Sequence, residues 1–160
     1  MKRSYAPAAE FGIGAMAGLR TMTPPAVIAL ATRRGWIHLG MSPFARLISA
    51  RSSKTIIELA ISELIADKLP FTPSRLRFQP LVSRVLSGAI CGATVSSVLK
   101  RPLVAGAVLG ALGAIAGAVA GHHVRTNSRH DTSPFSTALL EDALAITGSV
   151  TITALIGTAK

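Results

Sequence analysis

Residues 103–121 read LVAGAVLGALGAIAGAVAG, an uncharged apolar run that decides the fold class. As an α-helix with a rise of 1.5 Å per residue, these residues would extend about 28 Å, close to the roughly 30 Å hydrocarbon thickness of a bilayer. A run of this length without a charge is typical of a transmembrane helix. The stretch therefore predicts an integral membrane protein.

Two further apolar runs predict membrane-spanning helices of the same kind. Residues 143–159 carry no charge, and residues 81–99 are interrupted only by Arg84. Residues 53–69 form a more charged helical segment of about 25 Å, which is either a short span buried in the bundle or an interfacial or re-entrant helix. We expect an all-α, polytopic membrane helix bundle of four to five hydrophobic segments, forming a single domain over residues 1–160.

The first hydrophobic region, residues 8–31, is the least regular of these segments. It contains Glu10, Arg20 and the pair Pro24-Pro25. A proline inside a helix removes a backbone N–H donor and clashes with the preceding turn, so we expect the segment to be broken at this pair. Such a break persists at membrane depth only where protein or a water-filled cavity covers the freed backbone groups.

The charge distribution indicates a lipid bilayer as the partner and excludes nucleic acid. The net charge is +10, and 49% of the residues are hydrophobic against 15% charged. The basic residues occur in short groups between apolar segments, and aromatic residues, at 4%, are too few for base stacking. Basic groups flanking apolar segments are what insertion beside anionic headgroups requires.

The same basic groups leave two topologies open. If residues 53–69 span the membrane, the two sides carry eight Lys and Arg residues each, with Arg20 inside a span. The positive-inside rule then selects no orientation, which fits dual insertion and an antiparallel dimer. If the segment lies in the interface, the counts become five and eleven, and one orientation is favoured.

Glycines form narrow faces on three of the predicted helices. In lipid, such a face allows two helix backbones to approach closely. The glycine faces serve either to pack helices within one bundle, or to form a dimer interface or a permeation path. We expect the chain to form a homo-oligomer. The helix-packing glycines are Gly14, Gly18, Gly88, Gly92, Gly106, Gly110, Gly113, Gly117 and Gly121.

Ionisable residues inside apolar segments are costly and are therefore candidates for function. Glu63 and Asp67 lie one helical turn apart, so they would repel each other if both were buried without a cation or a proton. We expect Arg20 or Arg84 to lie within salt-bridge distance of one of these carboxylates. The alternative is a structural ion-pair network. The candidate ion- or substrate-binding residues are Arg20, Glu63, Asp67, Lys68, Arg84, Glu141 and Asp142.

Other chemistry has little support in the sequence. Adjacent histidines on a helix point to different faces, so His122-His123 with His130 do not predict a metal site. Cys91, alone in an apolar segment, is expected to be a packing residue. No catalytic motif occurs, and we expect no cofactor.

Several short motifs follow one another in a characteristic order. They are Gly18-Leu19-Arg20, then Glu63 followed by Asp67-Lys68-Leu69-Pro70, then Pro80, Arg84 and Gly88, and finally Ser133-Pro134-Phe135-Ser136 leading to Glu141-Asp142. In this order the chain resembles, over nearly its whole length, a family of small bacterial integral membrane proteins classed as domain of unknown function 4126. The resemblance implies a multi-pass protein of the bacterial inner membrane and no established activity.

Three functions fit these observations. A small transporter or an ion or proton pathway would use the buried Glu, Asp and Arg cluster together with the helix break. A membrane scaffold or assembly protein would hold its partners through the glycine faces. An anionic-lipid-binding or lipid-modifying protein would place Arg75 and Arg77, with Arg84, on a lipid phosphate. We rank transport first.

Overall fold

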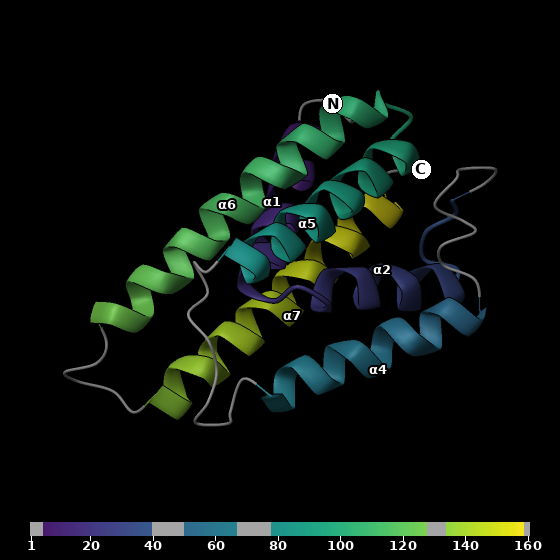
Figure 1. The fold of residues 1–160 in the computed structure, drawn as a ribbon. Helices are drawn as coiled ribbons and strands as arrows, with labels where there is room; N and C mark the ends of the chain where they lie inside the picture. Colours follow the sequence, from purple (N-terminus) through teal and green to yellow (C-terminus); the bar gives the residue numbers. More distant parts are fainter. Residues whose placement is uncertain (1–4, 40–49, 67–77, 128–133, 159–160) are drawn as a thin grey trace.

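The computed structural model of the 160-residue chain describes residues 5–39, 50–66, 78–127 and 134–158, which contain six α-helices and no strand. Three of the helices are long and apolar enough to cross a membrane, over Leu81–Val98, Leu103–Asn127 and Ser136–Thr158. The predicted all-α bundle is confirmed. Its helices are α1 (Ala6–Leu19), α2 (Thr23–Arg33), α4 (Ala50–Ala66), α5 (Phe78–Val98), α6 (Leu103–Asn127) and α7 (Pro134–Thr158), shown in Figure 1.

The centre of the fold is a unit of three helices, α1, α5 and α6, whose backbones are brought into contact by glycines. Gly14 of α1 lies against Gly110 of α6, and Gly92 of α5 lies against Gly106. A Cβ atom added at any of these positions would overlap the facing backbone. Because lipid provides no hydrophobic force between helices, such close contact supplies the dispersion energy that holds them together.

The glycine face of α6 is divided between two neighbours. Gly106 meets α5, Gly110 meets both α5 and α1, and Gly113 and Gly117 meet α1 around Ala15. The remaining positions follow the same arrangement, since Gly18 and Gly88 lie against α6 and Gly121 is buried. The glycine face is therefore occupied by helices of the same chain.

The first hydrophobic region is broken, as its prolines predict. α1 ends at Leu19 and α2 begins at Thr23, with Pro24 and Pro25 in the first turn of α2. The break thus lies at residues 20–22, just before the prolines and not at them. The first backbone N–H groups of a helix have no intrahelical partner, so a proline begins α2 at no hydrogen-bond cost.

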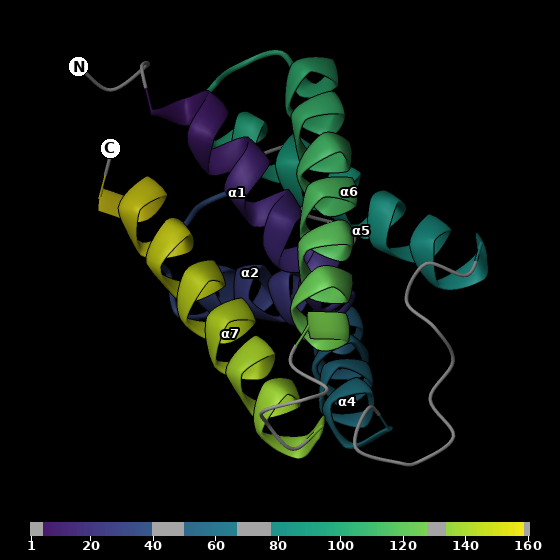
Figure 2. The same ribbon diagram turned by 90° about the vertical axis from the view of Figure 1, so that its left-hand side faces the viewer.

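After the break, α2 returns toward the end of the bundle at which α1 begins. Trp36, just after α2, lies against Gly157 near the end of α7, and Ile152, about one turn earlier in α7, reaches Gly12 of α1. Figure 2 shows the start of α1 and the end of α7 at the same end of the molecule. At 14 residues, or about 21 Å, α1 is too short to cross a bilayer by itself. Together α1 and α2 form a V with the break at its vertex.

An apolar cluster joins the two arms of the V. Ile13 of α1 and Ile28 of α2 pack with Val95 of α5 and Ile156 of α7. All of these side chains are fully or almost fully buried. The cluster fixes the direction in which α2 returns, because swinging α2 away would expose it.

The segment predicted as the second helix is α4, which lies against α2 (Figure 1). It begins at Ala50, ahead of the expected start at residue 53, and the last expected residues, 67–69, lie outside the described residues. Its outer side exposes Leu59, Ile61 and Ile65. Among the described helices, α4 packs substantially only against α2, so it is the most peripheral element of the fold.

Candidate functional site

Side chains from three helices converge on the break between α1 and α2. We call this the break site, and define it as residues 18–22, the end of α1 and the linker, with the four side chains that bind or pair with them. The four are Glu63 from α4, Arg84 and Ser87 from α5, and Asp142 from α7. A helix that ends inside a bundle leaves backbone donors and acceptors without partners, and the break site supplies them.

Glu63 binds the backbone at the start of α2. Its two carboxylate oxygens accept hydrogen bonds from the backbone N–H groups of Thr21 and Met22, each at 2.7 Å. N–H groups at a helix start carry partial positive charge and lack intrahelical acceptors, so they favour a carboxylate. Hydrogen bonds to a charged acceptor are roughly twice as strong as neutral ones.

Arg84 and Ser87 bind the carbonyl groups that the break leaves free. The Arg84 guanidinium donates to the carbonyl oxygens of Gly18 and Leu19, the second at 3.3 Å. The Ser87 hydroxyl donates to the carbonyl oxygen of Thr21 at 2.6 Å. Each broken helix end therefore faces a side chain whose charge complements its dipole. Arg84 thus points inward, from the same face of α5 as Gly88.

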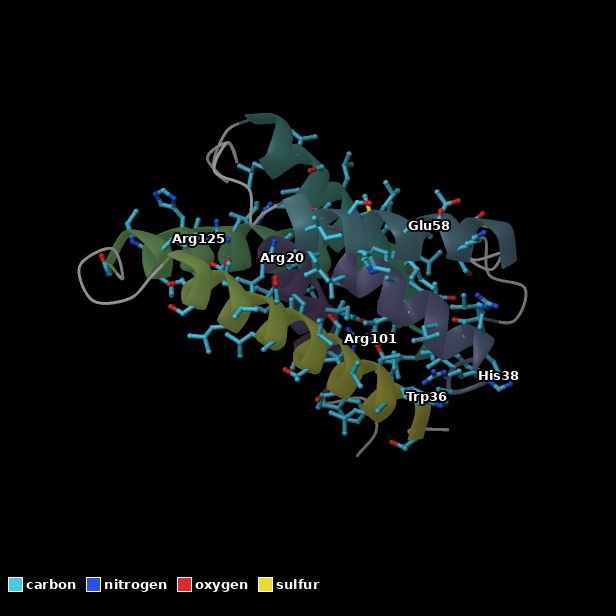
Figure 3. All side chains as sticks on the ribbon, turned by 90° about the horizontal axis from the view of Figure 1, so that it is seen from below. Arg20, Trp36, His38, Glu58, Arg101 and Arg125 are labelled. Carbon is cyan, nitrogen blue, oxygen red and sulfur yellow. The ribbon has the colours of Figure 1, made fainter. Side chains whose placement is uncertain are left out.

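Arg20, within the linker, forms a buried ion pair. Its side chain is fully buried and pairs with Asp142 of α7, whose side chain is 10% exposed. Figure 3 shows Arg20 inside the bundle, next to α7. Because removing water from two charges is costly, such a pair persists only when the partners stay together.

The expected pairing of Arg20 or Arg84 with Glu63 does not occur among the described residues. Arg20 pairs with Asp142, and Glu63 binds main-chain N–H groups. Backbone donors freed by a break have no signature of their own in the sequence. Opposite charges on side chains therefore could not reveal that Glu63 binds the main chain. The other expected carboxylate, Asp67, and the neighbouring Lys68 lie outside the described residues, as do Arg75 and Arg77.

Glu141 has a partner of its own, away from the break site. Both of its carboxylate oxygens face the Arg125 guanidinium of α6, at 2.8 to 3.2 Å. Adjacent helix residues point about 100° apart, so Glu141 and Asp142 serve different neighbours. Figure 3 places Arg125 toward the end of α6, away from Arg20.

A second ionic group lies near the start of α1, and we call it the Glu10 cluster. Glu10 is fully buried, and its Oε1 accepts a hydrogen bond from the Ser96 hydroxyl at 2.5 Å. The Arg101 Nε lies 3.2 Å from the same oxygen. The sequence marked Glu10 as a charge in an apolar segment but did not identify its partners.

The turn between α5 and α6 brings Arg101 to Glu10. Lys100 has a positive φ of 54°, and the Arg101 N–H donates to the carbonyl of Ser96 at 2.8 Å. The Lys100 N–H donates to the carbonyl of Ser97 at 3.2 Å. These bonds define a Schellman motif, which folds the chain back over the last turn of α5. A positive-φ residue is hard to recognise in sequence when it is not glycine.

Groups able to hold a metal ion do not gather in the described part of the chain, where no three His, Cys, Asp or Glu side chains come together. His122 and His123 have ring centres 6.3 Å apart, and His130 lies outside the described residues. Cys91 is buried and carries a free thiol in the apolar cluster.

Comparison with protein families gives a match over most of the chain. The model of a domain of unknown function, DUF4126, matches residues 8–155. This range contains both the break site and the Glu10 cluster. Comparison with curated proteins and with solved structures gives no match.

Proposed function

The chain belongs to the DUF4126 family, and from the geometry of the break site we propose that it is a small transporter or an ion or proton pathway of the bacterial inner membrane. The break site is its working element. In transporters with discontinuous helices, the helix N-termini face anionic groups and the unwound carbonyls face cations. The V of α1 and α2 offers both kinds of helix end at one place.

The observation that carries the proposal is the two-point binding of Glu63 to the N–H groups of Thr21 and Met22. A carboxylate on a neighbouring helix occupies the place of an anionic ligand at a helix start. Arg84 occupies the corresponding cationic place at the carbonyl end of α1. Both contacts can open without breaking the internal hydrogen bonds of either helix, as a gated pathway requires.

Two further observations favour transport over the other functions. The glycine faces are covered by contacts between α1, α5 and α6. A partner protein therefore cannot pack closely against these glycines, as it would in a scaffold. Arg84 is 5% exposed and donates to backbone carbonyls, so its guanidinium is not directed at a lipid phosphate.

Flux through reconstituted vesicles tests the proposal. Purified protein in vesicles containing a pH-sensitive dye, under an imposed membrane potential, is expected to move protons faster than protein-free vesicles. Glu63→Gln should lower this flux at least about tenfold, which corresponds to about 1.4 kcal/mol in the barrier.

Glu58→Gln is the matched control on the same helix. Glu58 is 61% exposed and its cation partner is Lys54, one turn away on the surface (Figure 3). It should leave the flux at the parent level. Vesicles that move neither protons nor Na⁺ or K⁺ above the protein-free rate would reject a transport function.

A further inference from the structure

Among the described carboxylates, Glu63 is the one whose partners are all neutral. No Lys or Arg of the described residues lies within salt-bridge distance of it, and its hydrogen-bond donors are two backbone N–H groups. Every other described carboxylate has a cationic partner. The pairs are Glu10 with Arg101, Glu58 with Lys54, Glu141 with Arg125, and Asp142 with Arg20.

This difference decides which carboxylate can bind a proton at the lowest cost. Protonating Asp142 would remove the negative charge that pairs with the fully buried Arg20, which is strongly unfavourable. Protonating Glu63 leaves only neutral N–H groups behind. A protonated carboxyl group is also a weaker hydrogen-bond acceptor. One of its oxygens then carries a hydrogen, which faces the hydrogen of an N–H group instead of accepting it. Proton binding therefore weakens the contact with Thr21 and Met22.

We propose that Glu63 is the proton-binding group of the break site, and that proton binding releases α4 from the start of α2. The inference rests on the proposed function and names the ion that this function uses. The carboxylate takes up one proton and loses its negative charge, and no other bond is made or broken except the two N–H hydrogen bonds.

The position of α4 fits such a release. Among the described helices, α4 packs substantially against α2 alone, and its outer side is exposed. The contact between Glu63 and residues 21–22 holds the last turns of α4 at the vertex of the V. Loosening this contact frees one end of a peripheral helix and leaves the three-helix unit of α1, α5 and α6 intact.

The other charged groups at the vertex are already engaged. From the linker, Arg20 pairs with Asp142 of α7, and from α5, Arg84 binds the carbonyls at the end of α1. On α4 itself, Glu58 and Lys54 lie toward solvent. Because each of these groups keeps its own partner, the protonation of Glu63 is the change that alters the contact between α4 and α2.

Thiol labelling tests the release directly. Met22→Cys places a half-buried thiol beside the contact and leaves the backbone N–H in place, while the native Cys91 is buried. The labelling rate in lipid nanodiscs is divided by the rate of the same protein carrying Glu63→Gln, which cancels the pH dependence of the thiol. We expect the ratio to rise at least about fivefold toward one between about pH 8 and about pH 4.

Glu58→Gln in the Met22→Cys background is expected to follow the parent curve. Infrared difference spectra of the same samples should show a protonated carboxyl band that follows the labelling curve. This band should be missing from Glu63→Gln, or shifted in Glu63→Asp if the glutamine variant does not fold. A labelling ratio that stays constant with pH, or a band that survives Glu63→Gln, would overturn the inference.

The measurements separate this inference from the transport function, because neither labelling nor infrared spectra require flux. A protein that binds the proton and releases α4 but conducts nothing contradicts the transport function alone. A protein that conducts while the labelling ratio is independent of pH contradicts proton binding by Glu63 alone.

Discussion

The two ends of α1 are held by opposite kinds of contact. Near its start, the backbone is continuous and a side chain of α1 itself, Glu10, is bound by Ser96 and Arg101. At its end, the backbone is interrupted, and side chains of other helices bind the main chain. The first arrangement is an ion pair to a fully buried carboxylate, whose charge would remain if the Arg101 side chain were removed. The second includes a carboxylate, Glu63, that can lose its charge without taking the negative partner away from a cation.

The difference teaches why ionisable residues collect at the break. A helix can end inside an apolar bundle only if something replaces its missing hydrogen bonds, since lipid offers none. Charged side chains from α4 and α5 make the strongest such replacements. The charges at the break site are therefore required by the interrupted backbone, whether or not an ion passes.

The two ends of the helix bundle also differ in their basic residues, and this difference predicts a single membrane orientation. Arg33 and Arg34 lie at the end of α2, beside the Trp36 that meets the end of α7, and Arg101 pairs with Glu10 near the start of α1. Arg125 instead pairs with Glu141 near the start of α7, at the other end of the bundle. The positive-inside rule places the first end in the cytoplasm. A reporter fused after α7 should therefore be found there in nearly all molecules. Equal amounts of both orientations would support the antiparallel dimer instead and would remove this contrast between the ends.

Deleting the arginine at each end should give unequal losses of stability. Arg20 is fully buried, so Arg20→Ala removes the cation that pairs with Asp142 at a place shielded from water, and should lower the free energy of unfolding by about 3–5 kcal/mol. Arg101 is 25% exposed, so water can replace it beside Glu10, and Arg101→Ala should cost about 1–3 kcal/mol.

Unfolding in detergent, followed by circular dichroism, measures both losses. Lys54→Ala, which removes an exposed pair, should stay within about 1 kcal/mol of the parent. Adding Asp142→Asn to Arg20→Ala should recover part of the loss, because the side chain that faced Arg20 is then neutral. Equal losses of unfolding free energy for the two arginine variants would show that the burial of the arginine does not determine how strongly each ion pair stabilises the fold.

The smallest expected effect concerns the packing that joins the two ends. A Cβ atom at Gly113 would overlap the backbone carbonyl of Phe11, so Gly113→Ala must push α1 away from α6. We expect a loss of about 1–3 kcal/mol, and faster amide exchange at both ends of α1 together. Gly148→Ala is the matched control, since its Cβ atom would meet only the flexible end of Met16, and it should change stability by less than about 0.5 kcal/mol. Faster exchange at one end alone would contradict a rigid α1.

The membrane class, the glycine contacts and the existence of a break could be predicted from the sequence by itself. The uncharged residues 103–121 are long enough to span a bilayer, and their glycines recur at helical spacing. Pro24 and Pro25 forbid a continuous first helix. Each of these features depends on residues that are close together in the sequence, and not on which distant segments pack against them.

The partners at the break were decided only by the tertiary structure. Glu63 reaches the N–H groups of Thr21 and Met22 because α4 lies against α2, and Arg20 takes Asp142 because α7 passes the vertex of the V. Ser87 likewise acquires its role from the carbonyl that the break exposes. Backbone donors and acceptors are the same at every residue in the sequence. Which of them become free, and which side chain arrives to bind them, depends on where the helices end and how they pack.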